Sequence, residues 1–346
     1  MLSDSVSQWD RCTFENHLQI CYHYEYLETL SEVLEKIPKI GILTEEQNSY
    51  CAEVKRYLEK IDGDIATTYK LKFRPQKFLA ALDEIYEKFD EDREPTESFL
   101  KRAVMKFLLE LSRFGQDIQN SDEAEEGCST RLFCAFAEMC CMHSEISLDK
   151  GDCTIWKNFK GMTEVTSLPD IRLYSYGIKT TKTATSKSQF PVSVVEVKKS
   201  VEKQFGESEL LDALTERLES TDLSSSISSL ASSDDSSGKP PIEEYLKNSK
   251  SLGQHAGQLL LELHKCHKDY KNCPILTMSG MIIDGTKVFF TVLEMKKKHL
   301  NKLENNEELD EDDQALIYYS QPFDLIYSDE RSIFIDNIMR LNNIEL

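Results

Sequence analysis

The spacing of apolar residues changes near residue 120, and this change limits what the chain can fold into. Before it, apolar residues recur at the i, i+3, i+4 and i+7 positions of amphipathic helices. The pattern predicts helices over 45–60, 78–89 and 99–111. Thr44 and Gln47 have the spacing of a capping box, and Gly115 predicts the end of the last helix. We therefore expect residues 1–125 to form an α-helical N-terminal region whose stripes pack as a core.

After residue 125, apolar segments of strand length alternate with segments of helix length. The expected order is a helix over 130–143, strands over 154–159, 170–176 and 192–197, a helix over 252–267, strands over 275–283 and 287–295, and a helix over 332–342. Asp284-Gly285 is a strong signal for a tight hairpin turn. Residues 116–128 are polar and acidic, which predicts a linker between the two parts. We expect residues 126–346 to form one α/β domain.

Serine dominates one segment of the second part. Nine of the fourteen residues from 224 to 237 are serine. Such a segment cannot bury enough apolar surface to offset the entropy of ordering it. We therefore expect a disordered Ser-rich insertion at about 200–250, with one short helix over 209–218.

Acidic residues outnumber basic ones in the whole chain, with 61 Asp and Glu against 41 Lys and Arg. A net charge of −20 argues against non-specific coating of nucleic acid. Residues 157–203 reverse the balance with nine basic and four acidic residues, and the segment 179–187 has no acid. Phosphate contacts from this segment could position a nucleic-acid backbone. The alternative is a flexible, solvated loop.

The N-terminus has neither a basic n-region nor an apolar h-region, and the longest apolar stretch, 132–142, is too short to span a bilayer. None of the ten cysteines forms a CxxC pair. We therefore expect an intracellular protein, cytoplasmic or nuclear, with no membrane association and with reduced thiols. The chain also lacks the GxGxxG, Walker and GxSxG sequences that kinases, NTPases and triad hydrolases need.

Four residues near the end of one predicted helix could ligate zinc. They are His264, Cys266, His267 and Cys273. Their spacing matches no common structural zinc site. A helix end on the surface that leads into a loop is the favoured interpretation.

Charged side chains occur at the ends of two predicted strands that are otherwise apolar. Asp170 follows Pro169, which belongs at a strand start because proline cannot donate to a sheet ladder. Glu196 and Lys198 lie two residues apart and therefore share one strand face. Val197 lies on the other face. Burying charged groups costs free energy, so these side chains suggest a site. Asp170 and Glu196 would be two hard oxygen ligands for Mg²⁺, and Lys198 would be a cation beside a water molecule.

Pro169-Asp170, followed by Glu196-x-Lys198, resembles the signature of the PD-(D/E)XK (restriction-endonuclease-like) nuclease superfamily. The resemblance covers about 130–295. It implies an αβββαβ core and a metal-dependent nuclease that hydrolyses phosphodiester bonds of DNA or RNA. It further implies that Asp170 and Glu196 hold Mg²⁺ or Mn²⁺, that the Val197 carbonyl is a third ligand, and that Lys198 assists the attacking water.

The resemblance also implies residues on the flanking helices. Glu138, the only charge in the apolar stretch 132–142, is expected as an accessory metal ligand; the alternative is that it faces solvent or caps a neighbouring element. Some members of the superfamily have a glutamine on the helix after Glu-x-Lys. Gln254 and Gln258 lie one helical turn apart, and the sequence leaves open which of them serves the site.

A second function class remains open at this point. The chain could be a catalytically inactive nuclease-fold scaffold or a regulatory binding protein, with a protein partner on the helical N-terminal region. The distinction is geometric. In a nuclease, Asp170, Glu196 and Lys198 must converge within reach of one metal ion in a site open to solvent.

Overall fold

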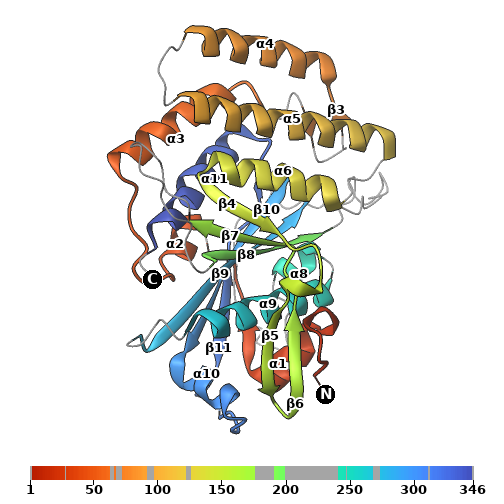
Figure 1. Cartoon of the computed structure of the whole chain (residues 1–346), viewed down its shortest axis with the longest axis vertical. Coiled ribbons are helices and arrows are strands. Elements are labelled where there is room, and N and C mark those ends of the chain that lie inside the picture. Colours follow the sequence, from red (N-terminus) through yellow and green to blue (C-terminus); the bar gives the residue numbers. More distant parts are fainter. Residues whose placement is uncertain are drawn as a thin grey trace, which may run out of the picture.

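A mixed sheet with helices on both faces organises the chain (Figure 1). The computed structural model describes residues 2–27, 29–62, 66–67, 72–91, 97–121, 126–175, 191–198, 241–246, 248–267, 273–310 and 312–344. Its helices are α1 (Arg11–Leu18), α2 (Leu30–Leu34), α3 (Glu45–Leu58), α4 (Pro75–Glu91), α5 (Glu97–Ser121), α6 (Glu126–Met139), α8 (Pro241–Leu246), α9 (Ser249–Cys266), α10 (Lys297–Glu304) and α11 (Ser328–Arg340). The coarse α/β class predicted from the sequence is confirmed.

The strands form one large sheet and two separate hairpins. They are β1 (Ile20–Tyr22), β2 (Ala66–Thr67), β3 (Lys72–Phe73), β4 (Met142–Ile146), β5 (Thr154–Phe159), β6 (Met162–Ser167), β7 (Ile171–Ser175), β8 (Ser193–Lys198), β9 (Ile275–Asp284), β10 (Lys287–Lys296), β11 (Ala315–Tyr319) and β12 (Phe323–Asp324). The 8-stranded sheet has the order β1-β11-β10-β9-β8-β7-β4, with β12 on β10. The hairpins are β2–β3 and β5–β6.

Two hydrophobic cores lie on opposite faces of the sheet. Val195 and Val197 of β8 face a core shared with α3, α4, α5, α6 and α11. Val194 faces the other core, which α1, α9 and α10 share. Figure 1 shows α4, α5 and α6 stacked on one side of the sheet and α9 on the other. The alternation along β8 therefore points every second side chain toward α9.

The helices expected in the first part are present, with one error at a helix end. The Thr44–Gln47 capping box opens α3, as predicted. The expected stop at Gly115 is wrong, because α5 continues to Ser121. Most of the expected linker over 116–128 is therefore helical, since α6 starts at Glu126. A single glycine lowers helix stability by only about 1 kcal/mol, which the packing of a long amphipathic helix can overcome.

The first strand of the sheet after α6 is not the one predicted. Cys141, with φ 58°, ends the helix, and β4 begins at once where the expected helix 130–143 still continued. The strand expected over 154–159 does exist, but it pairs with β6 in the separate hairpin. In the large sheet, β4 pairs antiparallel with β7, and β7 pairs antiparallel with β8.

The helix expected over 252–267 and the strands expected over 275–283 and 287–295 are present as α9, β9 and β10, whereas α8, α10, β11 and β12 were not predicted. Helix α9 connects β8 to β9, which is parallel to β8. Asp284 and Lys287 flank the predicted turn, and β9 pairs with β10 over their whole length. Within the described residues, no helix is both long enough and apolar enough to cross a bilayer. Most of the expected disordered insertion, with its helix over 209–218, lies outside the described residues. Its C-terminal end is wrong as a disordered segment, because α8 and the start of α9 are ordered there: Ile242 is buried in the core and Glu243 pairs with Arg11.

The sheet also takes a strand from the N-terminal side of residue 125. Strand β1 pairs in parallel with β11 in register Ile20↔Ala315, and α1 packs on α9. Helix α11, near the C-terminus, packs on α3. The division into regions 1–125 and 126–346 stays a prediction, but contacts cross it on both faces of the sheet.

Gly253 of α9 should be intolerant of a side chain. A Cβ atom there would lie 2.5 Å from the carbonyl carbon of Asp10 and 2.6 Å from that of Trp9. We expect Gly253→Ala to lower the free energy of unfolding by about 2 kcal/mol, because the N-terminal segment must move away from α9. Urea denaturation measures this. The control Gly127→Ala, where a Cβ meets only the Arg131 side chain at 3.7 Å, should be neutral or slightly stabilising; equal losses would contradict the close approach.

Candidate active site

The register of β7 and β8 places Asp170 opposite Glu196. The ladder pairs Ile171 with Val195, and one further step along both strands reaches these two acidic residues. Asp170 lies just outside β7, where the ladder ends. Its Oδ2 accepts a hydrogen bond from the Val197 backbone N–H at 2.6 Å. The Asp170 side chain thus continues the contact between the two strands after their backbone pairing has stopped.

Glu196 is almost fully buried, at 2% exposure, and both of its carboxylate oxygens have a partner. Lys198 Nζ donates to Oε1, and Gln258 Nε2 of α9 donates to Oε2. Glu196 and Lys198 therefore share a strand face, as the alternation predicts. Lys198 is partly exposed, with 21% of its side-chain surface accessible, so the site reaches solvent through this side chain and the half-buried Asp170.

The two carboxyl groups raise each other's cost of ionisation. Burial raises the pKa of Asp170 to about 7, and the neighbouring Glu196 carboxylate adds to the rise. Burial also raises the pKa of Glu196, while Lys198 and Gln258 oppose this rise by favouring its charged form. Either a proton or a nearby cation lowers this cost, and the Lys198 ammonium is one such cation, bonded to Glu196.

The donor atoms at this point suit a small divalent ion. The Asp170 and Glu196 carboxylates are hard oxygen ligands of the kind that Mg²⁺ and Mn²⁺ prefer. The N–H and C=O of one strand residue point to the same edge of the strand. Because the Val197 N–H is bonded to Asp170, the Val197 carbonyl lies on that edge too. The residues present therefore fit a metal ion held by Asp170, Glu196 and Val197.

The structure does not bring Glu138 to this site. Glu138 lies against Lys106 Nζ of α5, and both side chains are well exposed, at 40% and 51%. The acidic residue of α6 that does act on the site is Glu126, in the first helical turn. Its charge contributes to the raised pKa of both Asp170 and Glu196. The sequence pointed to Glu138 because it is the only charge in an apolar stretch, whereas Glu126 is one of many acids in a polar segment.

The two glutamines of α9 differ in burial and in their contacts. Gln258 is fully buried and bonds to Glu196, whereas Gln254 is only half-buried and makes no hydrogen bond that the described residues show. His255, three residues before Gln258 on α9, shares a hydrogen bond of 2.8 Å with Thr291 of β10. Burial lowers the pKa of His255 to about 3, so this imidazole is neutral, and its hydrogen bond joins α9 to β10.

A buried ion pair flanks the site on β7. Arg172 donates to Glu262 Oε1 of α9 at 2.7 Å and to Thr154 Oγ1 at 3.1 Å. Arg172 is 6% exposed, although it is one of the nine basic residues in 157–203. It therefore anchors α9 to the sheet instead of offering its charge to a phosphate. The segment 179–187, expected to contact phosphate, lies outside the described residues.

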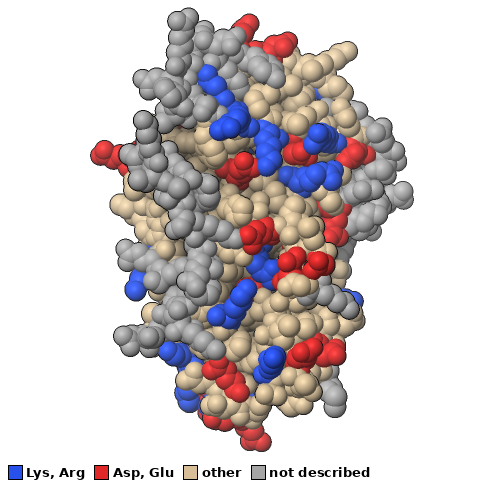
Figure 2. Space-filling model, viewed as in Figure 1, with Lys and Arg blue, Asp and Glu red and all other residues tan. Residues whose placement is uncertain are grey.

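Charges on the face shown in Figure 2 are mixed in sign. Basic side chains lie over α5 and α6, with acidic side chains beside them. Ion pairs also join these two helices, since Arg113 of α5 and Arg131 of α6 both contact Glu110. On this face the described residues do not form one continuous basic surface.

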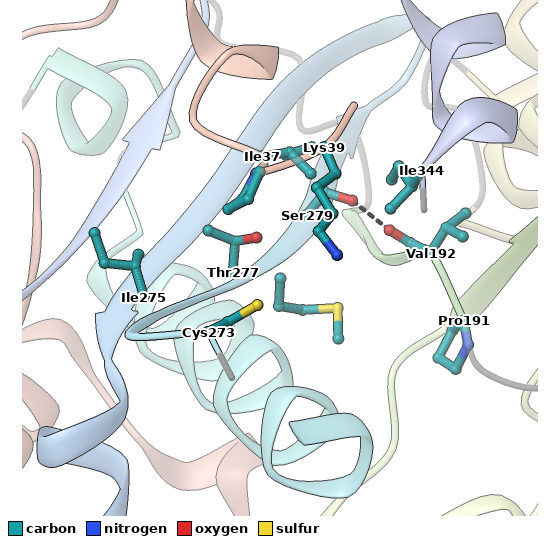
Figure 3. A pocket seen from close by; sticks show the side chains of 11 residues that line it. Ile37, Lys39, Pro191, Val192, Cys273, Ile275, Thr277, Ser279 and Ile344 are labelled. Carbon is teal, nitrogen blue, oxygen red and sulfur yellow. Dashed lines mark hydrogen bonds between the residues drawn. The ribbon is translucent and has the colours of Figure 1, made fainter. Parts of the chain in front are cut away.

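The pocket drawn in Figure 3 belongs to a different part of the sheet. Val192, Thr277 and Ser279 line it near the starts of β8 and β9, and the Ser279 hydroxyl donates to the Val192 carbonyl. Glu196 and Lys198 lie at the opposite end of β8. Its lining side chains are mostly apolar, and none of them belongs to the candidate active site.

Asp170→Asn is expected to stabilise the metal-free protein at high pH. Because the pKa of Asp170 is raised in the folded protein, ionising this group destabilises the fold. The destabilisation is absent below about pH 4, grows as the pH rises, and is complete above about pH 7. The amide oxygen can still accept the Val197 N–H. We expect a gain of about 2 kcal/mol at pH 8 and almost none at pH 4, measured by urea denaturation in EDTA.

The matched control is Asp312→Asn, at an exposed turn carboxylate far along the chain. It should change stability little at either pH. If Asp170→Asn raised the free energy of unfolding equally at pH 4 and pH 8, the charge on Asp170 would not be the cause of the increase.

Asp170, Glu196 and Lys198 therefore converge with Gln258, while Glu138 and Gln254 make other contacts. This arrangement places two carboxylates that could hold a divalent cation beside the ammonium group of Lys198. No protein-family model matches the chain, and no curated protein matches it.

Proposed function

We propose that this chain is a metal-dependent nuclease that hydrolyses phosphodiester bonds of DNA or RNA. The observation that carries the proposal is the convergence of Asp170 and Glu196 across the end of the β7–β8 ladder, with Lys198 bonded to Glu196. A carboxylate pair with a raised pKa beside a lysine is a functional-site pattern.

The topology supports the same proposal. Helix α6 is followed by the antiparallel strands β4, β7 and β8, then by α9 and the parallel strand β9. This order agrees with the αβββαβ core that the resemblance to the PD-(D/E)XK superfamily implies, with the β5–β6 hairpin added between β4 and β7 and α8 added before α9. In it, the Pro-Asp and Glu-x-Lys residues meet on neighbouring strands.

Each residue then has a physical role. When bound, Mg²⁺ or Mn²⁺ would offset the phosphate charge and make a coordinated water more acidic. Asp170, Glu196 and the Val197 carbonyl would hold that ion. Gln258 fixes the Glu196 carboxylate from the side of α9. Lys198, whose ammonium group lies at Glu196, would orient the attacking water by its positive charge.

The test is a cleavage assay on single- and double-stranded DNA and RNA with Mg²⁺, Mn²⁺ or EDTA. The proposal predicts cleavage of at least one substrate with Mg²⁺ or Mn²⁺ and none with EDTA. The absence of metal-dependent cleavage on all four substrates would favour the inactive scaffold, in which Lys198 and Gln258 permanently satisfy Glu196.

A further inference from the structure

Two histidines and a glutamate meet where the C-terminal ends of α9 and α10 lie together. His264 and His267 lie one turn apart at the end of α9, and Glu304 is the last residue of α10. Glu304 Oε1 is 3.2 Å from His264 Nε2 and 3.1 Å from His267 Nε2. The three potential ligand atoms all lie within 4.8 Å of one another. Ligands of a tetrahedral zinc ion, at about 2.0–2.1 Å from the metal, are about 3.3 Å apart.

The tautomer of His267 indicates that a positive charge lies between its Nε2 atom and Glu304. Its Nδ1 faces the backbone carbonyl oxygen of His264 at hydrogen-bond distance, and a carbonyl can only accept. Nδ1 must therefore carry the hydrogen, so Nε2 of the neutral ring points its lone pair at Glu304 Oε1. Two acceptors that face each other at 3.1 Å need a positive charge between them, either a proton or a metal ion. An Nδ1–H bonded to a backbone carbonyl is the usual second interaction of a metal-bound histidine.

The second imidazole is held in place by an aromatic neighbour. His264 stacks on the buried Trp156 of β5, with ring centroids 3.8 Å apart and planes inclined by 5°. This contact fixes the plane of the ring and thereby the direction of its nitrogen atoms. On α10, the nearby Lys302 is already bonded to Asp310 and Asp313, so its charge is directed away from Glu304.

We propose that His264, His267 and Glu304 bind a zinc ion, with water in the remaining position. Two imidazole nitrogens and one carboxylate oxygen suit Zn²⁺, whereas Mg²⁺ prefers oxygen ligands. The ion would tie the end of α9 to the end of α10. This site is separate from Asp170 and Glu196, and the proposal does not rest on the proposed nuclease function.

The cysteines considered with these histidines take no part. Cys266 is 1% exposed and packs in the core below α9, and Cys273 lines the pocket of Figure 3. Glu304 supplies the third ligand instead. It lies 37 residues after His267, so no local spacing rule for zinc sites could have found it.

The test uses the full chain, freed of metal by a chelator, and titrated with Zn²⁺ by calorimetry. The chain should bind one Zn²⁺ that Glu304→Gln and His264→Gln weaken by about tenfold or more. With zinc about 100-fold above its Kd, the melting temperature should rise by about 5 °C in the unmodified chain and much less in both variants. Glu304→Gln keeps the shape of a partly exposed side chain, so loss of binding with normal melting in EDTA excludes misfolding.

Two controls separate this site from others. His143→Gln changes a half-exposed histidine that also contacts a glutamate, Glu145 at 3.6 Å, and should leave the affinity for zinc unchanged. Glu196→Gln should also bind one Zn²⁺ at this site. Binding in His264→Gln and Glu304→Gln as strong as in the unmodified chain, or no binding of Zn²⁺ at all, would overturn the proposal. A proton shared by His267 and Glu304 would then explain their contact.

Discussion

Glu196→Gln should reduce metal-dependent cleavage by about 10³-fold or more. The amide keeps the size of the side chain but removes one of two carboxylates that face the same point at the end of β8. A neutral amide is a weak ligand for Mg²⁺, so both the affinity for metal and the charge stabilisation of the transition state should fall. Calorimetric titration with Mn²⁺ measures the loss of metal affinity, and single-turnover cleavage of the preferred substrate measures the loss of rate.

The matched control for this variant is Glu164→Gln. Glu164 is an exposed residue of β6, so the substitution removes the same charge from the surface without touching the site. It should leave cleavage and Mn²⁺ affinity nearly unchanged. If Glu196→Gln retained full cleavage, or if both variants lost the same fraction, Glu196 would not be a metal ligand.

Lys198→Met should separate turnover from metal binding. The substitution keeps the bulk of the aliphatic stem and removes the ammonium that donates to Glu196. Mn²⁺ should bind as tightly or more tightly, because both carboxylates remain and a competing cation is gone. Turnover should fall by about 10²–10³-fold, the usual loss when one positioned electrostatic group is removed from an active site.

Lys157→Met is the control for Lys198→Met, because Lys157 is an exposed basic residue on β5 of the same charged segment. A surface lysine that only attracts a nucleic acid should affect substrate affinity slightly, and more at low salt. Equal losses of turnover at the two positions would mean that Lys198 acts as a surface charge, and its role toward water would be wrong.

The sequence predicts those features that depend on neighbouring residues. The capping box at Thr44 and Gln47 and the turn at Asp284-Gly285 are fixed by local hydrogen bonds and turn geometry, and both are confirmed. The shared face of Glu196 and Lys198 follows from strand alternation alone. Each of these depends on fewer than five consecutive residues.

Features that depend on tertiary partners could not be read in this way. Residues 154–159 have the composition of a strand, but composition does not say whether a strand joins the large sheet or a separate hairpin. Likewise, Glu126 and Glu138 lie on the same helix, and only the position of α6 over the sheet makes Glu126 the one that acts on Asp170. Long-range contacts decide both cases.

Asp170→Asn, assayed for cleavage beside the unmodified chain, tests the central claim most directly. The variant keeps the hydrogen bond to Val197, and its folded state should be at least as stable, so a loss of activity cannot come from unfolding. With both proteins purified identically and assayed in Mg²⁺, the account predicts cleavage by the unmodified chain and a loss of about 10³-fold or more in the variant. Equal cleavage by the two preparations would contradict the account, because cleavage would then not depend on Asp170.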